Sequence, residues 1–242
     1  MSLFSIFKSI MPTKPPTCTA VIAAAGISVR CQGEDKIFYT VNDKPVLVYT
    51  LEVFENCNLI DDIIIVAHED RVERIGNLCT EYGFKKVSKI MHGGATRIES
   101  VMNGVFAVSG KTNLIAVHDG ARPCIDTETL ERTINKAATH NAAAPAVSVP
   151  STVKRVENDS IIETVDREGL YEIQTPQIFK AEVIKAALTY VKKKSIEVTD
   201  DCMAVEKIGI PVYIVEGSRR NIKITDNQDF RIVEALLNEE YY

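Results

Sequence analysis

Short apolar runs alternate with amphipathic helical stripes along almost the whole chain. The runs are rich in β-branched residues and too uniformly apolar to have a face in water; they lie at 20–24, 63–66, 114–117, 142–149 and 212–215. A stripe such as Ile98, Val101 and Val105 has instead the spacing of a helix with one buried face. Apolar strands separated by helices predict an α/β fold: a Rossmann-like, mostly parallel sheet with helices on both faces.

Local signals place the other expected helices. Pro45 can be the first residue of a helix, because its fixed φ suits the first turn and its missing N–H is not needed there. A second stripe begins at Val72 and stops at Gly83, and Asp126 or Thr127 is expected to cap the next helix. Two further stripes predict helices at 183–191 and 230–237.

The chain of 242 residues has the length of one large domain or two small ones. Residues 1–17 are expected to be an N-terminal appendage and linker, because Lys14-Pro15-Pro16 interrupts the pattern. We expect residues 18–242 to form a single domain. The polar, β-like segment Ser151–Gln174 breaks the strand–helix rhythm and predicts an arm, at about residues 151–168, that leaves the sheet.

Charge and cysteine usage narrow the class of protein. A net charge of −5 argues against a general nucleic-acid-binding protein. Six scattered cysteines without a C-x-x-C pair favour reduced thiols over zinc or a disulfide framework. The apolar stretch of residues 1–11 is interrupted by Lys8 and is too short to span a membrane. We therefore expect a cytoplasmic protein that binds neither nucleic acid nor membrane.

The first motif with chemical content is the loop Ala23–Lys36. Small residues after a strand, here Ala23-Ala24-Ala25-Gly26, let backbone N–H groups approach an anion, and Arg30 and Lys36 can neutralise it. The loop is neither a Walker A loop nor a dinucleotide fingerprint, since the required glycines are missing. In isolation, a plain strand-to-helix turn explains it equally well.

Two further motifs also follow predicted strands. Gly93-Gly94 exposes backbone groups that can read the edge of a base, and Ser100 can point the same way from the next helix. Asp119, directly after a buried strand, can bind a metal or a ribose hydroxyl, and Arg122 can bind a phosphate or a structural carboxylate. His118 is expected to be a structural histidine.

Together with polar clusters later in the chain, these motifs form an ordered set of blocks. The blocks are the Ala-Ala-Gly loop with Arg30 and Lys36, Gly93-Gly94 with Arg97 and Ser100, His118 to Pro123, Thr164 to Arg167, Gln174 to Gln177, and Asn221 to Thr225. In this order they resemble the 2-C-methyl-D-erythritol 4-phosphate cytidylyltransferase family of the non-mevalonate isoprenoid pathway. The resemblance covers residues 19–237.

The resemblance implies an enzyme that transfers CMP from CTP to methylerythritol phosphate, with Mg²⁺ as cofactor. The catalytic residues would be Arg30, Lys36, Arg167 and Lys223. The nucleotide would be held by Ala24, Ala25, Gly26, Gly94, Ala95, Ser100 and Asp119, and Asp119 would also be the metal ligand. The acceptor would be held by Asp119, Arg122, Thr152, Thr175, Thr199 and Thr225. Members of the family are homodimers whose arm reaches into the partner, so Thr152 and Arg167 would serve the neighbour's site.

Several residues in the loop depart from the family pattern. Ser28 replaces a usual glycine, Cys31 a usual methionine, and Asp35 and Ile37 flank Lys36 where Pro or Asn and Gln are common. Two alternatives stay open: a ribitol-5-phosphate cytidylyltransferase, whose loop usually reads Ala-Gly-Gly, and a non-catalytic nucleotide-binding protein on the same fold. The missing glycine fingerprint disfavours an NAD-linked oxidoreductase.

Overall fold

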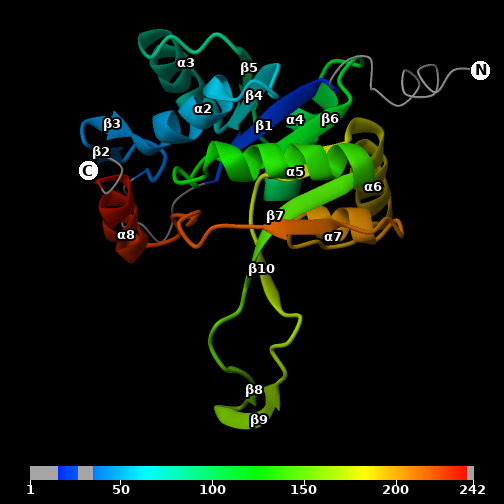
Figure 1. Ribbon diagram of the computed structural model, residues 1–242. Helices are drawn as coiled ribbons and strands as arrows, with labels where there is room; N and C mark the ends of the chain where they lie inside the picture. Colours follow the sequence, from blue (N-terminus) through cyan, green and yellow to red (C-terminus); the bar gives the residue numbers. More distant parts are fainter. Residues whose placement is uncertain (1–15, 27–34, 239–242) are drawn as a thin grey trace, which may run out of the picture.

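A computed structural model describes residues 16–26 and 35–238. In this part of the chain eight strands form one mixed sheet, in the order β10-β7-β11-β6-β1-β4-β5 with β12 beside β7 (Figure 1). The strands of the sheet are β1 (Cys18–Ala24), β4 (Asp62–Ala67), β5 (Val87–His92), β6 (Leu114–Asp119), β7 (Ala142–Ser148), β10 (Tyr171–Ile173), β11 (Gln177–Lys180) and β12 (Tyr213–Glu216). The short strands β2 (Thr40–Val41) and β3 (Lys44–Pro45) pair separately.

The parallel half of the sheet confirms the prediction from the apolar runs. Strands β6, β1, β4 and β5 lie side by side and run in the same direction. Every residue of β6 is buried, and so are all but the first residue of β4. These strands are apolar on both sides because helices cover both faces of the sheet.

The other half of the sheet contains two antiparallel strands that the apolar pattern does not predict. Strand β11 lies between β6 and β7 and runs antiparallel to both. Strand β10 pairs antiparallel with the end of β7. Both come from the stretch after the arm, where Gln177 and the exposed residues of β10 do not form a uniform apolar run. The sheet is therefore mostly, but not wholly, parallel.

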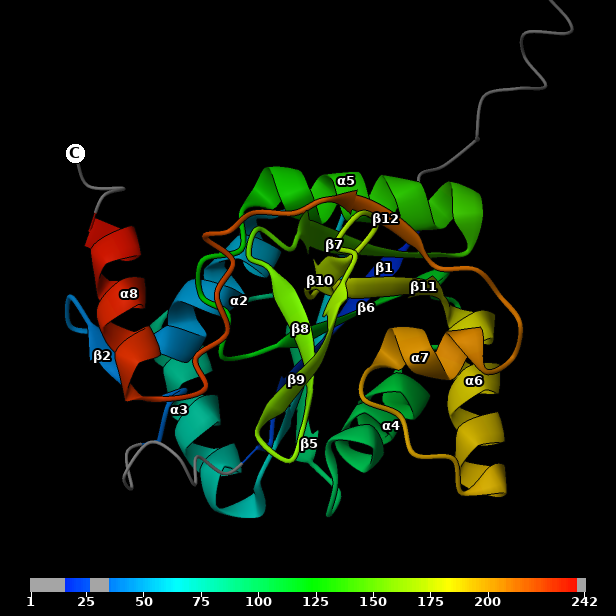
Figure 2. The same ribbon diagram turned by 90° about the horizontal axis from the view of Figure 1, so that it is seen from below.

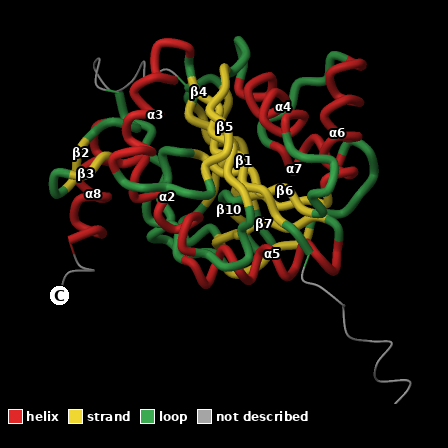
Figure 3. The backbone as a smooth tube through the Cα atoms, turned by 90° about the horizontal axis from the view of Figure 1, so that it is seen from above, coloured by secondary structure: helices red, strands yellow, loops and turns green. Residues whose placement is uncertain are grey.

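The helices form two layers, and successive residues of a strand point to opposite layers. On β1, Ala20 and Ile22 pack against one core, and Val21 between them packs against the other. Figure 3 shows the sheet edge-on between the two groups of helices. One layer contains α2 (Val46–Asn56), α3 (Val72–Glu81), α5 (Thr127–His140) and α8 (Asn227–Asn238); the other contains α4 (Arg97–Ala107), α6 (Ala181–Lys194) and α7 (Asp201–Glu206).

The helix boundaries follow from local chemistry, with one correction. Pro45 is not the first residue of its helix: its ψ of 143° is extended, so it precedes α2, which begins at Val46. Asp126 caps α5 as expected, and its carboxylate accepts the Thr129 N–H. Helix α3 ends before Gly83, whose positive φ of 70° suits glycine.

A hairpin stands away from the body of the molecule (Figure 1), and in the view from below it lies in front of the sheet (Figure 2). Strands β8 (Val153–Glu157) and β9 (Ser160–Val165) pair antiparallel within the segment predicted to leave the sheet. Val156, Ile161 and Ile162 are more than half exposed on it. The hairpin is therefore not stabilised by the main core of its own chain.

No helix among the described residues is both long enough and apolar enough to cross a membrane. The cysteines that the structure describes are free thiols; they are Cys18, Cys57, Cys79, Cys124 and Cys202.

The packing of α4 on the sheet depends on a glycine. A Cβ at Gly104 would lie 2.4 Å from Val21 Cγ1 and 2.8 Å from Val66 Cγ2, so the helix can approach β1 and β4 only without it. We therefore expect Gly104→Ala to lower the free energy of unfolding by about 1–3 kcal/mol, measured by urea denaturation.

Gly76→Ala on α3 is the matched control. A Cβ there would meet Ile90 Cδ1 at 3.8 Å, an ordinary contact. The free energy of unfolding of this variant should rise by about 0.5–1 kcal/mol, because alanine is the better helix former. Equal effects of the two substitutions would contradict the close packing of α4.

Candidate active site

Four parallel strands end side by side and carry their loops to one edge of the sheet. In the registers of the sheet Asp119 is level with Ala23, Ala24 with Ala67, and Ala67 with His92. The segments that follow these residues are therefore neighbours, although they are far apart in the sequence. The carboxyl ends of parallel strands are where ligands bind in open α/β sheets.

The two glycine-containing loops fit tightly together at this edge. A Cβ at Gly93 would lie 2.6 Å from the Ala25 Cβ and 2.7 Å from Ser100 Oγ. The hydroxyl of Ser100 accepts the Gly94 N–H at 3.0 Å and donates to the Thr96 carbonyl at 3.0 Å. Ser100 therefore shapes the loop from the first turn of α4.

A capping box fixes the start of the same helix. The Thr96 side chain accepts the Glu99 N–H, and the Glu99 carboxylate accepts the Thr96 N–H. The capping box thereby fixes the backbone that leads from the Gly94 loop into α4.

A cavity of about 430 Å³ lies between the loops. Its lining includes nine of the predicted site residues: Ala24, Ala25, Gly26, Lys36, Gly94, Ala95, Ser100, Asp119 and Lys223. It also includes residues that were not assigned a role from the sequence, among them His68 and Arg97. The cavity thus brings together the predicted nucleotide-binding loops, the acidic residue and two lysines.

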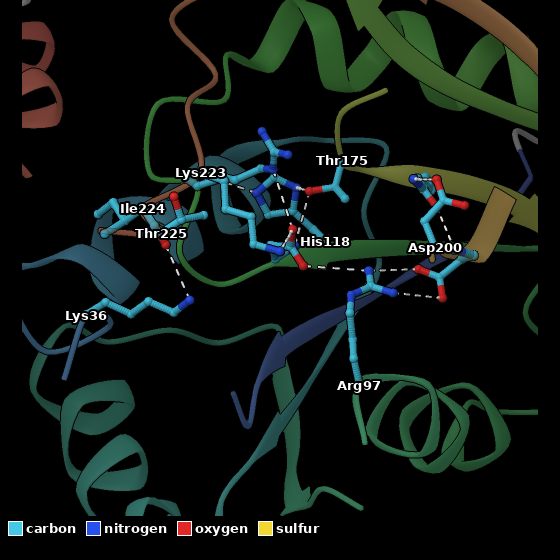
Figure 4. Close-up of polar contacts among 12 residues, drawn as sticks. Lys36, Arg97, His118, Thr175, Asp200, Lys223, Ile224 and Thr225 are labelled. Carbon is cyan, nitrogen blue, oxygen red and sulfur yellow. Dashed lines mark hydrogen bonds and ion pairs between the residues drawn. The ribbon is translucent and has the colours of Figure 1, made fainter. Parts of the chain in front are cut away.

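The carboxylate of Asp119 lies among three cations, of which Figure 4 labels Lys223 and Arg97. Lys223 Nζ is 2.9 Å from Asp119 Oδ2, Arg122 Nε is 3.5 Å from the same oxygen, and Arg97 Nη2 is 3.6 Å from Oδ1. Burial by itself raises the pKa of Asp119, but the charges of Lys223, Arg97 and Arg122 outweigh burial and hold it well below its usual range. Asp119 is therefore an ionised carboxylate under physiological conditions.

Arg97 is held from behind by a second, completely buried carboxylate. Its two terminal nitrogens lie 3.3 and 3.0 Å from the oxygens of Asp201, whose side chain is 0% exposed. Burial raises the pKa of Asp201, and the guanidinium of Arg97 opposes that rise. The Gln177 side chain accepts the Asp201 N–H at 3.0 Å and so fixes the start of α7.

Sequence reasoning gave neither Arg97 nor Asp201 a role in the site. Arg97 was noted only within the second block, and Asp201 only as part of a polar cluster. A signal was present in the acidic pair Asp200 and Asp201 at the start of the short helix α7, but no spacing rule links position 201 to position 97.

Backbone contacts bring the late segment of residues 221–225 to the cavity. Arg122 Nη1 donates to the Asn221 carbonyl at 2.7 Å, and the Ile224 N–H donates to the Ala121 carbonyl at 2.9 Å. Lys36 Nζ donates to the Ile224 carbonyl at 3.3 Å, on the other side of the same segment (Figure 4). Lys223 is thereby positioned between the loop after β6 and Lys36.

His118 is a structural residue, as predicted. It is 0% exposed, and burial lowers its pKa to about 4, so the imidazole is neutral at pH 7. Because the Arg122 carbonyl can only accept, His118 Nε2 carries the proton, and Nδ1 accepts from the hydroxyl of Thr175. That hydroxyl accepts the Asp119 N–H at 3.2 Å, so the chain of bonds fixes the backbone of Asp119.

Several predicted acceptor-binding residues do not line the cavity. Thr175 is 4% exposed and lies behind Asp119. The hydroxyl of Thr225 donates to Asp229 Oδ2 at 2.8 Å near the start of α8. The Thr199 hydroxyl lies 3.6 Å from Met203 Sδ. Arg122 is adjacent to the cavity, and its guanidinium contacts Asp119 and the Asn221 carbonyl.

Two predicted residues lie by the arm, and one lies outside the described residues. Thr152 is exposed at the start of the arm. Arg167 is exposed at its end and donates to the Pro150 carbonyl. Within one chain neither residue is part of the cavity lining. Arg30, with Ser28 and Cys31, falls in residues 27–34, outside the described part of the chain.

The side chains available as ligands limit how a metal ion can be bound at the cavity. Within residues 16–26 and 35–238 there is no group of three or more His, Cys, Asp or Glu side chains that could hold an ion. The cavity does contain the ionised carboxylate of Asp119. One carboxylate together with substrate phosphates is a usual arrangement for Mg²⁺, so the site fits an ion that arrives with a nucleotide.

Comparison with known proteins gives one family. Residues 18–239 match the family model of 2-C-methyl-D-erythritol 4-phosphate cytidylyltransferase. A protein of that name from Halalkalibacterium halodurans is 39% identical over 223 residues, which cover 92% of this chain and 97% of the relative. Another, from Dehalococcoides mccartyi, is 40% identical over 221 residues, covering 91% and 96%.

Solved structures agree with this assignment. The chain is similar to a 4-diphosphocytidyl-2C-methyl-D-erythritol synthase, with a TM-score of 0.77, 34% identity and coverage of 92% of this chain and 99% of the other. It is also similar to the synthase from Anaerococcus prevotii, with a TM-score of 0.82, 30% identity and coverage of 93% and 97%. The chain therefore belongs to the 2-C-methyl-D-erythritol 4-phosphate cytidylyltransferase family.

Proposed function

We propose that this protein transfers CMP from CTP to 2-C-methyl-D-erythritol 4-phosphate and releases pyrophosphate, in isoprenoid precursor biosynthesis. The observation that carries the proposal is the single cavity in which two small-residue loops meet Lys36, Asp119 and Lys223. The loops suit a nucleotide, and the cations around Asp119 suit a second phosphate. The proposal extends to this chain the activity for which its relatives are named.

The reaction is an in-line substitution at phosphorus. An oxygen of the acceptor's phosphate forms a bond to the α-phosphorus of CTP, and the bond from that phosphorus to the bridging oxygen breaks, so pyrophosphate leaves. Such a step requires positioning and charge stabilisation rather than a nucleophilic side chain. We assign the nucleotide to the loops at Ala24–Gly26 and Gly94–Ser100, with Lys36, and Arg30 as expected from the sequence, stabilising charge on the α-phosphate.

The acceptor's phosphate is assigned to the side of the cavity that carries Lys223. The ammonium group of Lys223 is held 2.9 Å from Asp119 Oδ2, so its position is set before substrate arrives. A fixed donor needs no reorganisation during the reaction, which is where such sites gain most of their rate.

A divalent cation belongs to the proposal as a companion of the triphosphate. Mg²⁺ would be held by phosphate oxygens and by the Asp119 carboxylate, and it supplies neutralisation of the phosphate charge. Among the described residues no cluster of side chains could hold a resident metal ion, so the ion is proposed to arrive with the nucleotide.

We propose further that the protein acts as a homodimer in the cytoplasm. The hairpin β8–β9 exposes Val156, Ile161 and Ile162, and Thr152 and Arg167 lie at its ends, outside their own chain's cavity. A partner subunit that receives the hairpin would bury these apolar residues and gain a cation for its acceptor phosphate. The described cysteines, all free thiols, are compatible with a reducing compartment.

The first prediction from the proposed function concerns the substrates. With CTP, Mg²⁺ and methylerythritol phosphate the protein should release pyrophosphate, and replacing CTP by ATP or the acceptor by ribitol 5-phosphate should lower kcat/KM. A preference for ribitol 5-phosphate would show the related cytidylyltransferase instead. Binding of CTP without pyrophosphate release would show a non-catalytic nucleotide-binding protein.

The second prediction concerns Lys36. Lys36→Ala removes one preorganised cation and should lower kcat by about 10²–10³-fold while leaving the thermal unfolding midpoint unchanged. Lys89→Ala is the control, because Lys89 also donates to a backbone carbonyl, that of Ala107 at 2.7 Å, but lies outside the cavity lining. Near-normal turnover of the Lys36 variant would refute its catalytic assignment.

The third prediction concerns the arm. Arg167→Met and Lys36→Ala should each be nearly inactive alone, but co-expressed chains should recover about a quarter of wild-type activity. In the mixed dimer the Lys36→Ala subunit has an intact arm, and the Arg167→Met subunit has an intact cavity. The arm of the first completes the cavity of the second, so one of the two sites is active. If mixing gives only the sum of the two parents, Arg167 does not act in the neighbouring subunit.

A further inference from the structure

Arg71 lies beside the nucleotide loop but does not line the cavity. It is the last residue of η1 (Glu69–Arg71), which follows β4 at the edge of the sheet where the site is built. Its side chain is only 13% exposed and turns toward the end of β1, the neighbouring strand. Neither the motifs nor the proposed chemistry gives this arginine a role.

The guanidinium of Arg71 contacts both ends of the loop Ala23–Lys36. Nη1 donates to the Ala24 carbonyl at 3.3 Å and to the Gly26 carbonyl at 3.0 Å. Nε lies 2.6 Å from Asp35 Oδ2. One side chain therefore joins the residues that precede the stretch 27–34 to the residue that follows it.

The two ends are also the parts of the loop that line the cavity. Ala24, Ala25 and Gly26 line one wall, and Lys36, next to Asp35, lines another. In a trans peptide the carbonyl and the next N–H point in opposite directions. Because the Ala24 carbonyl points to Arg71, the Ala25 N–H points away from it, which orients a donor suited to an anion.

Asp35 in turn sets the position of Lys36. The Asp35 carbonyl accepts the Phe38 N–H at 2.8 Å and the Tyr39 N–H at 3.0 Å, so Asp35 begins a tight turn that contains Lys36. Among the described residues its Oδ1 is buried without a hydrogen-bond partner, so Arg71 is the counter-charge that makes burial of this carboxylate tolerable.

We propose that Arg71, acting with Asp35, is a positioning residue for the nucleoside triphosphate. It holds the Ala24–Gly26 backbone and Lys36 at the separation that the triphosphate requires. The inference rests on the proposed function, since it concerns how that same cavity binds CTP.

The test compares CTP binding with acceptor binding in purified full-length variants. Arg71→Met should weaken CTP binding by isothermal titration calorimetry, and raise KM for CTP, by about tenfold to a hundredfold. KM for methylerythritol phosphate should stay within about twofold, because the contacts of Arg71 lie only on the nucleotide side. The CTP affinity of Arg71→Lys should be intermediate. Lysine keeps the positive charge opposite Asp35 but lacks the planar guanidinium that donates to several acceptors at once.

A double-mutant cycle tests the partnership with Asp35. Asp35→Asn should also weaken CTP binding. The double variant Arg71→Met with Asp35→Asn should bind CTP as tightly as Arg71→Met alone. Arg132→Met is the matched control: Arg132 likewise joins a carboxylate, Glu128, to a carbonyl, that of Glu216, but away from this cavity. It should leave CTP binding unchanged.

The outcomes separate this inference from the proposed function. Wild-type protein that fails to bind CTP would refute the proposed function itself. Wild-type binding with unchanged CTP affinity in Arg71→Met, or with equal rises in KM for both substrates, would refute the role of Arg71. Should Arg71→Met not fold, Arg71→Lys and Asp35→Asn decide by the same measurements.

Discussion

The ionised carboxylate of Asp119 is the charge around which the site is arranged. A buried carboxylate is costly unless it is paired, and here Lys223, Arg97 and Arg122 surround it. Each of these cations comes from a different part of the chain, and two of them also bind a second segment. Arg122 binds the Asn221 carbonyl and Arg97 binds Asp201. The electrostatic centre of the site is therefore also the junction that holds its walls together.

The sheet brings the residues of this junction together, and local hydrogen bonds fix their positions. Parallel strands with matched registers bring Ala23, Ala67, His92 and Asp119 to one edge. Within that edge, the neutral His118 and Thr175 set the backbone of Asp119, and Ser100 sets the Gly94 loop. His118 and Thr175 are buried behind Asp119 and bond to other protein groups, so Thr175 does not line the cavity although it belongs to a characteristic block.

Most of the fold and about half of the site could be predicted from the sequence, and the reasons for the rest are physical. Apolar strands and helix stripes are local signals, so β1, β4, β6 and α4 were found within a few residues. Strand β11 was missed because its pairing between β6 and β7 is decided by neighbours far along the chain. The same limit applies to Asp201 and Arg71, whose partners Arg97 and Asp35 are distant in sequence. Pro45 was misassigned by one residue because an extended ψ ahead of a helix is as compatible with its ring as the first helical turn.

A protein with a net charge of −5 builds a positive pocket by fixing its cations rather than by adding many of them. Among the described residues, Lys36, Arg97 and Lys223 line the cavity with Asp119, Arg122 lies beside it, and Asp201 binds Arg97. The two carboxylates reduce the total field that a triphosphate meets. In exchange they hold Arg97 and Lys223 in fixed positions, and a fixed cation stabilises charge without the reorganisation that a mobile side chain requires. The same reasoning applies to Arg71, which adds no charge to the cavity lining and instead constrains the backbone and the lysine that do the binding.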